Sequence, residues 1–265
     1  IGGIISFVEQ LSSNEFGNRV YVEDCRNNGL INAGSYAFTG GVAGYTKNYT
    51  TVERCFNFAT IIGKEVVSGV VGYAQNYCVI INSGNSGLIK PTGISTIAGV
   101  CASPRDTKII NCYNTGNIEM NYGEYIGGIA GNAYRDSDSD FGEITNCYNG
   151  GTITGANGAF TGSIFGILWN GYTVTNAYYK EGTHFRAYDP EGDPNNNVSN
   201  VTTFSQDPND QMSWILDEEM MGTTDLMEAL NAKGGTWQKD IYGNNKYMPT
   251  MFVGSVPSFE AFPSI

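Results

Sequence analysis

The residues in this sequence whose types and spacing could do chemistry are few. Asp136, Asp138 and Asp140 alternate along one segment, a spacing typical of the first half of a calcium-binding loop. However, Gly142 comes one position too late for such a loop, and Cys147 stands where the glutamate that completes the ligand set is required. We therefore expect a solvated acidic loop here and keep a calcium site as the alternative.

Other signatures of catalysis or cofactor binding are absent from the sequence. His184 is the single histidine, and no cysteine or serine motif is placed to use it as a base. The cysteines lack the paired spacing of a zinc site, and the glycines do not form a phosphate-binding loop. We therefore predict no catalytic residues, no metal and no cofactor.

Charge and hydropathy exclude two classes of partner. The formal net charge is −12, whereas nucleic-acid binding depends on Lys and Arg side chains that neutralise phosphates. No apolar run approaches the ~20 residues that a membrane-spanning helix requires. We expect neither a nucleic-acid partner nor a membrane-spanning segment.

Most of the chain consists of a two-part motif that recurs about every thirty residues. Its best copy pairs residues 126–131 (Ile-Gly-Gly-Ile-Ala-Gly) with residues 144–153 (Ile-Thr-Asn-Cys-Tyr-Asn-Gly-Gly-Thr-Ile). The copies are rich in Gly, Asn, Thr, Tyr, Ile and Val, a composition that favours strands and turns over helices. At ~3.3 Å per residue the period fits one coil of three short strands, whereas a propeller blade needs about forty residues.

We therefore predict an all-β fold, a single-stranded right-handed parallel β-helix of about six coils. The coils are expected to occupy residues 1–184. Residues 185–265 lack the repeat and are expected to form a small mixed C-terminal cap, with a short helix that follows Thr224 and ends at residues 233–235. Because the sequence starts inside a repeat, we also expect a preceding segment that covers the edge of the first coil.

Stacked coils place equivalent residues about 4.8 Å apart, so each repeat position forms a column. A column of small residues should face inward, and free thiols are favoured there over disulfides because serine and alanine fill the same position. Its members are Cys25, Cys55, Ser83, Cys112, Cys147 and Ala177. Further columns contain asparagines whose amides could bond from coil to coil, isoleucines, and glycines at turns expected to need positive φ. The asparagine column contains Asn27, Asn57, Asn85, Asn114 and Asn149. The isoleucine column contains Ile31, Ile61, Ile89, Ile118 and Ile153. The glycine column contains Gly29, Gly87, Gly116 and Gly151.

The combination of a Gly-hydrophobic-hydrophobic-Gly strand with a later Asn-Cys-Tyr-Asn turn resembles the GLUG-repeat proteins of bacterial cell surfaces. The resemblance covers about residues 1–182. The best matches are residues 41–44, 128–131, 111–114 and 146–149, and departures occur at 99–102, at 163–166 and at Gly84, where an aromatic residue is expected. It implies a secreted or surface-attached, non-catalytic module of a kind sometimes found in adhesins, and hence an extracellular or cell-surface location.

Aromatic residues beside the inward column are the candidate ligand-binding residues, because strand alternation should turn them outward. They are Phe56, Tyr113, Tyr148 and Tyr178; Tyr45 with Tyr73, and Tyr49 with Tyr77, form further matched pairs. Stacked outward rings can hold sugar rings or a partner surface. The alternative is that they only brace neighbouring coils as cross-strand pairs.

Together these features predict a non-catalytic module for adhesion or recognition, whose partner would be a host or bacterial surface glycan or protein. A passive spacer within a larger surface protein is one alternative. A polysaccharide lyase or hydrolase is another, because β-helices often carry such sites, although a fold alone does not define a function. Such a site needs converging carboxylates. Glu23 aligns with the neighbourhood of Glu53, but the next coils have isoleucines there.

Overall fold

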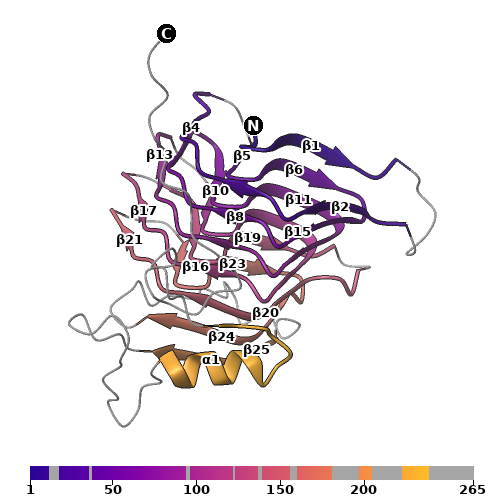
Figure 1. Ribbon diagram of the computed structural model, residues 1–265, viewed down its shortest axis with the longest axis vertical. Helices are drawn as coiled ribbons and strands as arrows, with labels where there is room; N and C mark the ends of the chain where they lie inside the picture. The colour runs from indigo at the N-terminus through magenta and orange to yellow at the C-terminus, as the bar shows by residue number, and fades with distance from the viewer. Residues whose placement is uncertain are drawn as a thin grey trace.

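The chain folds as a parallel β-solenoid of about five turns (Figure 1). The computed structural model describes residues 1–11, 18–35, 38–93, 96–121, 123–136, 139–155, 160–180, 197–204 and 223–238. The predicted parallel β-helix is therefore confirmed, with about five turns instead of about six. His184 and most of the expected cap, including residues 239–265, lie outside the described residues.

Each turn of the chain contributes strands to three sheets. The first sheet has five strands: β5 (Phe38–Gly40), β10 (Val66–Ser68), β14 (Thr96–Ala98), β18 (Tyr125–Gly127) and β22 (Phe160–Gly162). The second also has five: β4 (Ile31–Asn32), β9 (Ile61–Gly63), β13 (Ile89–Pro91), β17 (Ile118–Glu119) and β21 (Ile153–Thr154). Each of these two sheets contains five strands, one from each turn, and the solenoid is therefore counted as about five turns.

The third sheet has fifteen strands and bends around the remaining side of the solenoid. Its members up to the middle of the stack are β1 (Ile5–Glu9), β2 (Val20–Glu23), β3 (Arg26–Asn27), β6 (Ala43–Lys47), β7 (Thr50–Glu53), β8 (Phe56–Asn57), β11 (Val71–Ile81) and β12 (Gly84–Asn85). The others are β15 (Cys101–Ile110), β16 (Tyr113–Asn114), β19 (Ala130–Tyr134), β20 (Glu143–Asn149), β23 (Phe165–Trp169), β24 (Thr173–Lys180) and β25 (Asn197–Phe204).

The sheet extends past the boundary expected at residue 184. β25 pairs in parallel with β24, with Thr173 opposite Asn197 and Ala177 opposite Val201. The stack thus continues into the segment that lacks a recognisable repeat.

The inward column lies at the centre of the main apolar core. Cys55, Cys112 and Cys147 are fully buried and pack with residues such as Val52 and Ile109, whereas Cys25 in the first coil is half-buried. All six cysteines are free thiols. The isoleucine column is also in register, from Ile31 through Ile61, Ile89 and Ile118 to Ile153. Both columns occupy the predicted positions.

The asparagine column forms a continuous chain of amide hydrogen bonds through the stack. The Nδ2 of Asn57 donates to the Oδ1 of Asn85 at 2.7 Å, and Asn85 donates in the same way to Asn114 at 2.8 Å. The same bond joins Asn27 to Asn57 and Asn114 to Asn149. Since each of these side chains is buried, each amide is satisfied by its neighbours in place of water.

This asparagine column explains why the motif has two halves. A Cβ placed on Gly69, the first glycine of one Gly-hydrophobic-hydrophobic-Gly strand, would lie 2.3 Å from the Cγ of Asn85 in the same coil. The same close approach recurs between Gly99 and Asn114 and between Gly128 and Asn149. The glycine strand and the asparagine turn therefore pack directly against each other across the coil.

The expectation of positive φ at Gly29, Gly87, Gly116 and Gly151 is wrong, because the glycines with positive φ are elsewhere. A Cβ on Gly116 would lie 1.9 Å from the carbonyl oxygen of Gly87, the equivalent residue one coil earlier. A Cβ on Gly87 or Gly151 would lie equally close to the coil before it, so these three glycines permit close stacking of the backbone, whereas the nearest atom to a Cβ on Gly29 in the first coil is 3.9 Å away. One recurring left-handed position directly precedes the small inward residue, with φ between 50° and 57°, and its members are Asp24, Arg54, Asn82, Asn111, Asn146 and Asn176.

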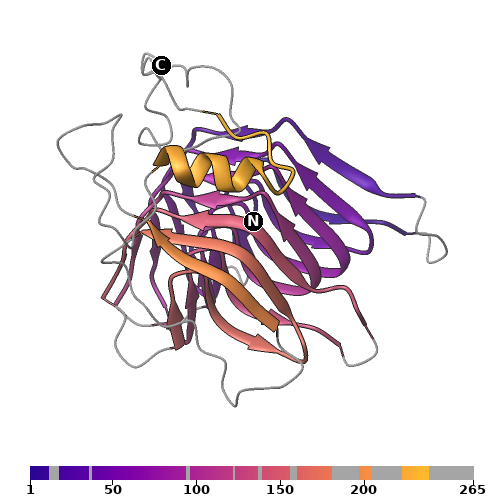
Figure 2. The same cartoon turned by 90° about the horizontal axis from the view of Figure 1, so that it is seen from below.

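Among the described residues there is a single helix, α1 (Thr223–Asn231). It lies close to β25 in Figure 1 and to one side of the last strands in Figure 2. It ends as the sequence predicts: Gly234 has φ 88°, its N–H donates to the carbonyl of Asn231, and the N–H of Gly235 donates to the carbonyl of Leu230. These two bonds are those of a Schellman motif.

Candidate functional site

The four aromatic residues expected to bind a ligand are buried. We call Phe56, Tyr113, Tyr148 and Tyr178 the covered column; their exposed fractions are 4%, 1%, 0% and 6%. They point away from the thiol core, as alternation predicts, but form a separate apolar cluster with Leu226, Leu230 and Trp237. The expectation that these rings are open to a ligand is therefore corrected, because α1 and Trp237 pack over them.

The covered column and the cap fit each other closely. Tyr113 and Tyr148 stack at 5.7 Å between ring centroids, and the Trp237 ring lies 5.4 Å from Tyr148. In addition, the Nδ2 of Asn146 donates to the carbonyl of Leu230 near the end of α1 at 2.8 Å. The column is thus part of the folded core and cannot serve as an open binding surface.

Gly84 is the position in this column where the sequence lacks an aromatic residue. A Cβ at Gly84 would lie 2.3 Å from the Cε1 of Tyr113. The Tyr113 ring therefore occupies the space above Gly84, and its centroid lies 6.2 Å from that of Phe56. The departure from the repeat pattern provides the room that this ring requires.

A second set of aromatic rings lies on the outer face of β1, β6 and β11. We call Phe7, Tyr45 and Tyr73 the open row, because strand register places them side by side and none is buried. Neighbouring ring centroids are 5.1 Å apart, both for Phe7 with Tyr45 and for Tyr45 with Tyr73. Phe38 of β5 packs beside Tyr45 and Tyr73.

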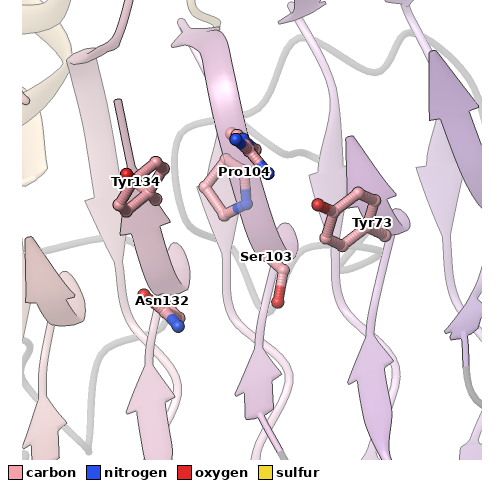
Figure 3. Close-up of a pocket in the computed structure, with 6 residues that line it drawn as sticks. Tyr73, Ser103, Pro104, Asn132 and Tyr134 are labelled. Atoms are coloured by element: carbon pink, nitrogen blue, oxygen red, sulfur yellow. The ribbon is translucent and has the colours of Figure 1, made fainter. Parts of the chain in front are cut away.

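The next two strands carry small polar side chains at the same position, and this change creates a groove. Ser103 of β15 lies opposite Tyr73, and Asn132 of β19 follows. The groove has a volume of about 270 Å³ and is lined by Tyr73, Ser103, Pro104, Arg105, Asn132 and Tyr134. Figure 3 shows the rings of Tyr73 and Tyr134 on opposite sides, with Ser103 and Pro104 between them. The site therefore has two aromatic walls and a polar floor.

Arg105 supplies the positive charge of this groove and is held on two sides. Its Nη2 lies 2.6 Å from the Oδ1 of Asp136, and its guanidinium lies over the Tyr134 ring at 5.2 Å from the centroid. The hydrogen bond to Asp136 raises the pKa of Arg105 above its ordinary value. The Nε of Arg105 is buried and has no hydrogen-bond partner in the part of the chain that the structure describes.

Asn132 is oriented by a neighbouring aromatic residue. The indole Nε1 of Trp169, on β23, donates to the Oδ1 of Asn132 at 3.0 Å. With its oxygen held there, the amide nitrogen of Asn132 is a donor, and Ser103 adds a hydroxyl that can donate or accept. The arrangement can therefore pack flat apolar faces and bond to hydroxyl groups, but it contains no nucleophile paired with a base.

Two of the three candidate calcium residues lie among the described residues. Asp136 pairs with Arg105, and its backbone N–H donates to the Oδ1 of Asp106. Asp140 is exposed, and Asp138 lies outside the described residues. Within the described ranges, no group of three or more His, Cys, Asp or Glu side chains is placed to hold a metal ion.

The stacked glutamates relevant to the enzymatic alternative are paired with an arginine. Glu23 lies opposite Glu53 in the sheet. Arg54 contacts Glu23 at 2.8 Å, Asp24 at 2.7 Å and Glu53 at 2.6 Å. None of these carboxylates lines the groove, and the arginine offsets one of their three negative charges.

Among the residues that line the groove, only Tyr73 is predicted from the sequence, as part of the pair Tyr45 and Tyr73. The sequence pattern does not point to Ser103, Pro104, Arg105, Asn132 and Tyr134. The available signal was a break in the outward row, where two small polar residues follow three aromatic residues. Because the distance from this row to the inward column differs between coils, alignment on the cysteines alone does not reveal it.

The fold and this site define a β-solenoid with a groove on its surface. The family model of the GLUG motif matches residues 122–154. This segment contains β18, β19, β20 and β21, which together make one full turn. The chain is therefore a β-solenoid with a GLUG motif, and its other coils stack in register on that turn. Comparison with curated proteins and with solved structures gives no match.

Proposed function

We propose that this chain is a non-catalytic recognition module of a bacterial extracellular or cell-surface protein, and that its groove binds a glycan. The GLUG motif and the β-solenoid fit a structural surface module. The observation that carries the proposal of recognition is the groove itself, in which Tyr73 and Tyr134 flank the polar side chains of Ser103, Arg105 and Asn132.

The chemistry of the groove supports a sugar as the ligand. Aromatic faces bury apolar area and leave one edge polar, which suits the C–H faces of a pyranose ring. Hydroxyl, amide and guanidinium groups between those walls can bond to sugar hydroxyls. No pair of carboxylates lines the groove, whereas glycoside hydrolysis depends on such a pair. We therefore favour binding over cleavage.

Two further observations concern the hydropathy and the charge of the chain. Among the described residues, no helix has the length and apolarity needed to cross a membrane. The net charge of −12 disfavours nucleic acid as the partner. A passive spacer remains the second candidate, since the uninterrupted asparagine column gives the solenoid a continuous internal support.

A glycan array compares the chain with the double variant Tyr73→Ala/Tyr134→Ala. We expect the wild-type chain to bind a subset of glycans and the variant to lose that binding. The matched control is Tyr49→Ala/Tyr77→Ala, which removes another stacked pair, with centroids 5.1 Å apart, that does not line the groove. Equal loss in both variants, or no binding by the wild-type chain on a broad array, contradicts the proposal and favours the spacer.

A further inference from the structure

Two rows of outward side chains cross the strands and pass through the groove. The first runs from Phe7 through Tyr45 and Tyr73 to Ser103. The second row consists of Glu9, Lys47, Gln75, Arg105, Tyr134 and Trp169, again in strand register. Both rows run parallel to the solenoid axis, because each step passes to the equivalent residue of the next coil. The groove is therefore the middle of a longer surface.

The spacing of these rows matches a chain of rings laid along the axis. Neighbouring parallel strands are separated by about 4.8 Å, and the rings of the open row repeat at 5.1 Å. A pyranose unit in an extended glycan advances by a similar length. Tyr73 and Tyr134 lie on strands two steps apart, which leaves ~10 Å between them. This length accommodates about two sugar units above Ser103 and Asn132.

Aromatic side chains continue beyond both walls of the groove. On one side are Tyr45 and Phe7, and Phe7 is 49% exposed. On the other is Trp169, which is 36% exposed and lies opposite Tyr134. A glycan longer than the groove would therefore meet further ring faces at the same spacing.

The charges along the surface are internally compensated. Lys47 pairs with Glu9 at 2.9 Å, and Arg105 pairs with Asp136 at 2.6 Å. Both cations of the second row thus have carboxylate partners. An acidic glycan would have to compete with these carboxylates, in a chain whose net charge is already −12. An uncharged glycan needs no such exchange.

We propose that the groove binds an uncharged, extended oligosaccharide that lies parallel to the solenoid axis and reaches from Trp169 across the groove to Tyr45 and Phe7. This inference rests on the proposed function and adds the charge, orientation and length of the ligand. It predicts that affinity increases with the number of sugar units until the chain covers both aromatic extensions.

Isothermal titration calorimetry with β-1,4-linked cello-, N-acetylchito- and manno-oligosaccharides of two to six units tests this inference. We expect at least one series to bind, with an affinity that increases up to about five units. The variant Phe7→Ala/Tyr45→Ala should weaken binding of the longest member about tenfold, equivalent to about 1.4 kcal/mol, and leave binding of the disaccharide unchanged. Tyr21→Ala is the control, because Tyr21 is an exposed aromatic residue of the first coil that lies in neither row.

The possible results separate this inference from the function on which it rests. A series whose affinity stops increasing at the disaccharide, or that is insensitive to Phe7→Ala/Tyr45→Ala, overturns the axial orientation but leaves glycan binding intact. Binding of oligogalacturonates with none of the three neutral series overturns the requirement for an uncharged ligand. Absence of binding to all four series and to a broad array overturns both proposals.

Discussion

The solenoid carries two stacked sets of aromatic side chains, of which one is buried and the other is not. The covered column (Phe56, Tyr113, Tyr148 and Tyr178) and the open row (Phe7, Tyr45 and Tyr73) both point away from the thiol core and both stack from coil to coil. The covered column is buried by α1 and Trp237, which follow it in the chain by many residues. The open row has no such cover among the described residues.

This comparison shows that strand alternation determines the direction of a side chain and not its exposure. The covered column is in energetic terms a second core, and its rings should contribute to folding as core residues do. The open row contributes cross-strand pairs of modest energy and leaves ring faces for a ligand. The following predictions test this division, from the largest expected effect to the smallest.

Tyr148→Ala should have the largest effect on stability. The Tyr148 ring is fully buried and contacts both Tyr113 and Trp237, so its removal leaves a cavity between the solenoid and α1. We expect the free energy of unfolding to decrease by about 3–5 kcal/mol, measured by urea denaturation followed by circular dichroism. Tyr148→Phe retains the ring and should cost about 1 kcal/mol. A loss below about 1 kcal/mol in Tyr148→Ala would show that α1 does not cover this column.

Gly84→Ala should destabilise the same column by a different route. The added methyl would lie 2.3 Å from the Tyr113 ring, so Tyr113 must move and disturb its contacts with Phe56 and Trp237. We expect a loss of about 1–3 kcal/mol, typical of overpacking. Gly29→Ala is the matched control, because the nearest atom to its added Cβ is 3.9 Å away. Equal effects of the two substitutions would contradict the proposed role of Gly84.

Much of this fold could be predicted from the sequence, because stacking repeats the same local requirement in every coil. The asparagine column, the isoleucine column and the inward thiols followed from a period of about thirty residues, and the structure has them in register. The left-handed position that precedes the inward residue could also have been predicted. Asparagines precede the inward residue in four coils, at Asn82, Asn111, Asn146 and Asn176, and asparagine tolerates the left-handed region better than most residues.

The candidate site could not be predicted in the same way. The burial of Tyr113 depends on Leu226, Leu230 and Trp237, which belong to a segment without a repeat. The groove depends on the register of β15 with its neighbours, and β11 has a register shift between Gln75 and Cys78 in that pairing. A local irregularity of this kind changes the alignment by one residue, which reverses the direction of a side chain.

The inward thiols are buried by the coils alone, without a contribution from α1, and can therefore be compared with the covered column. Burial raises the pKa of Cys55 to about 12, whereas an unfolded thiol ionises near its ordinary value of about 8.5–9. Below that value both states are protonated and the native state has its full stability. Above it the unfolded state loses a proton first, so stability falls as the pH rises towards 12.

We therefore expect this thiol to lower the free energy of unfolding by about 1.4 kcal/mol for each pH unit above 9. Urea denaturation at pH 8 and pH 10, in the presence of a reductant, measures the change. Cys55→Ala should reduce the pH dependence, and alanine is already present at this position in the last repeat, as Ala177. An identical pH dependence in the variant and the wild-type chain would contradict the assignment of the effect to this thiol.

Phe7→Ala should have the smallest effect on stability. Phe7 is 49% exposed, and its ring packs against Tyr45 at 5.1 Å, so its removal deletes one cross-strand pair and leaves no cavity. We expect the free energy of unfolding to change by less than about 1 kcal/mol, measured under the conditions used for Tyr148→Ala. A loss approaching that of Tyr148→Ala would mean that the open row is also part of the core. Its aromatic faces would then be unavailable to a ligand, and the distinction between the two sets of rings would disappear.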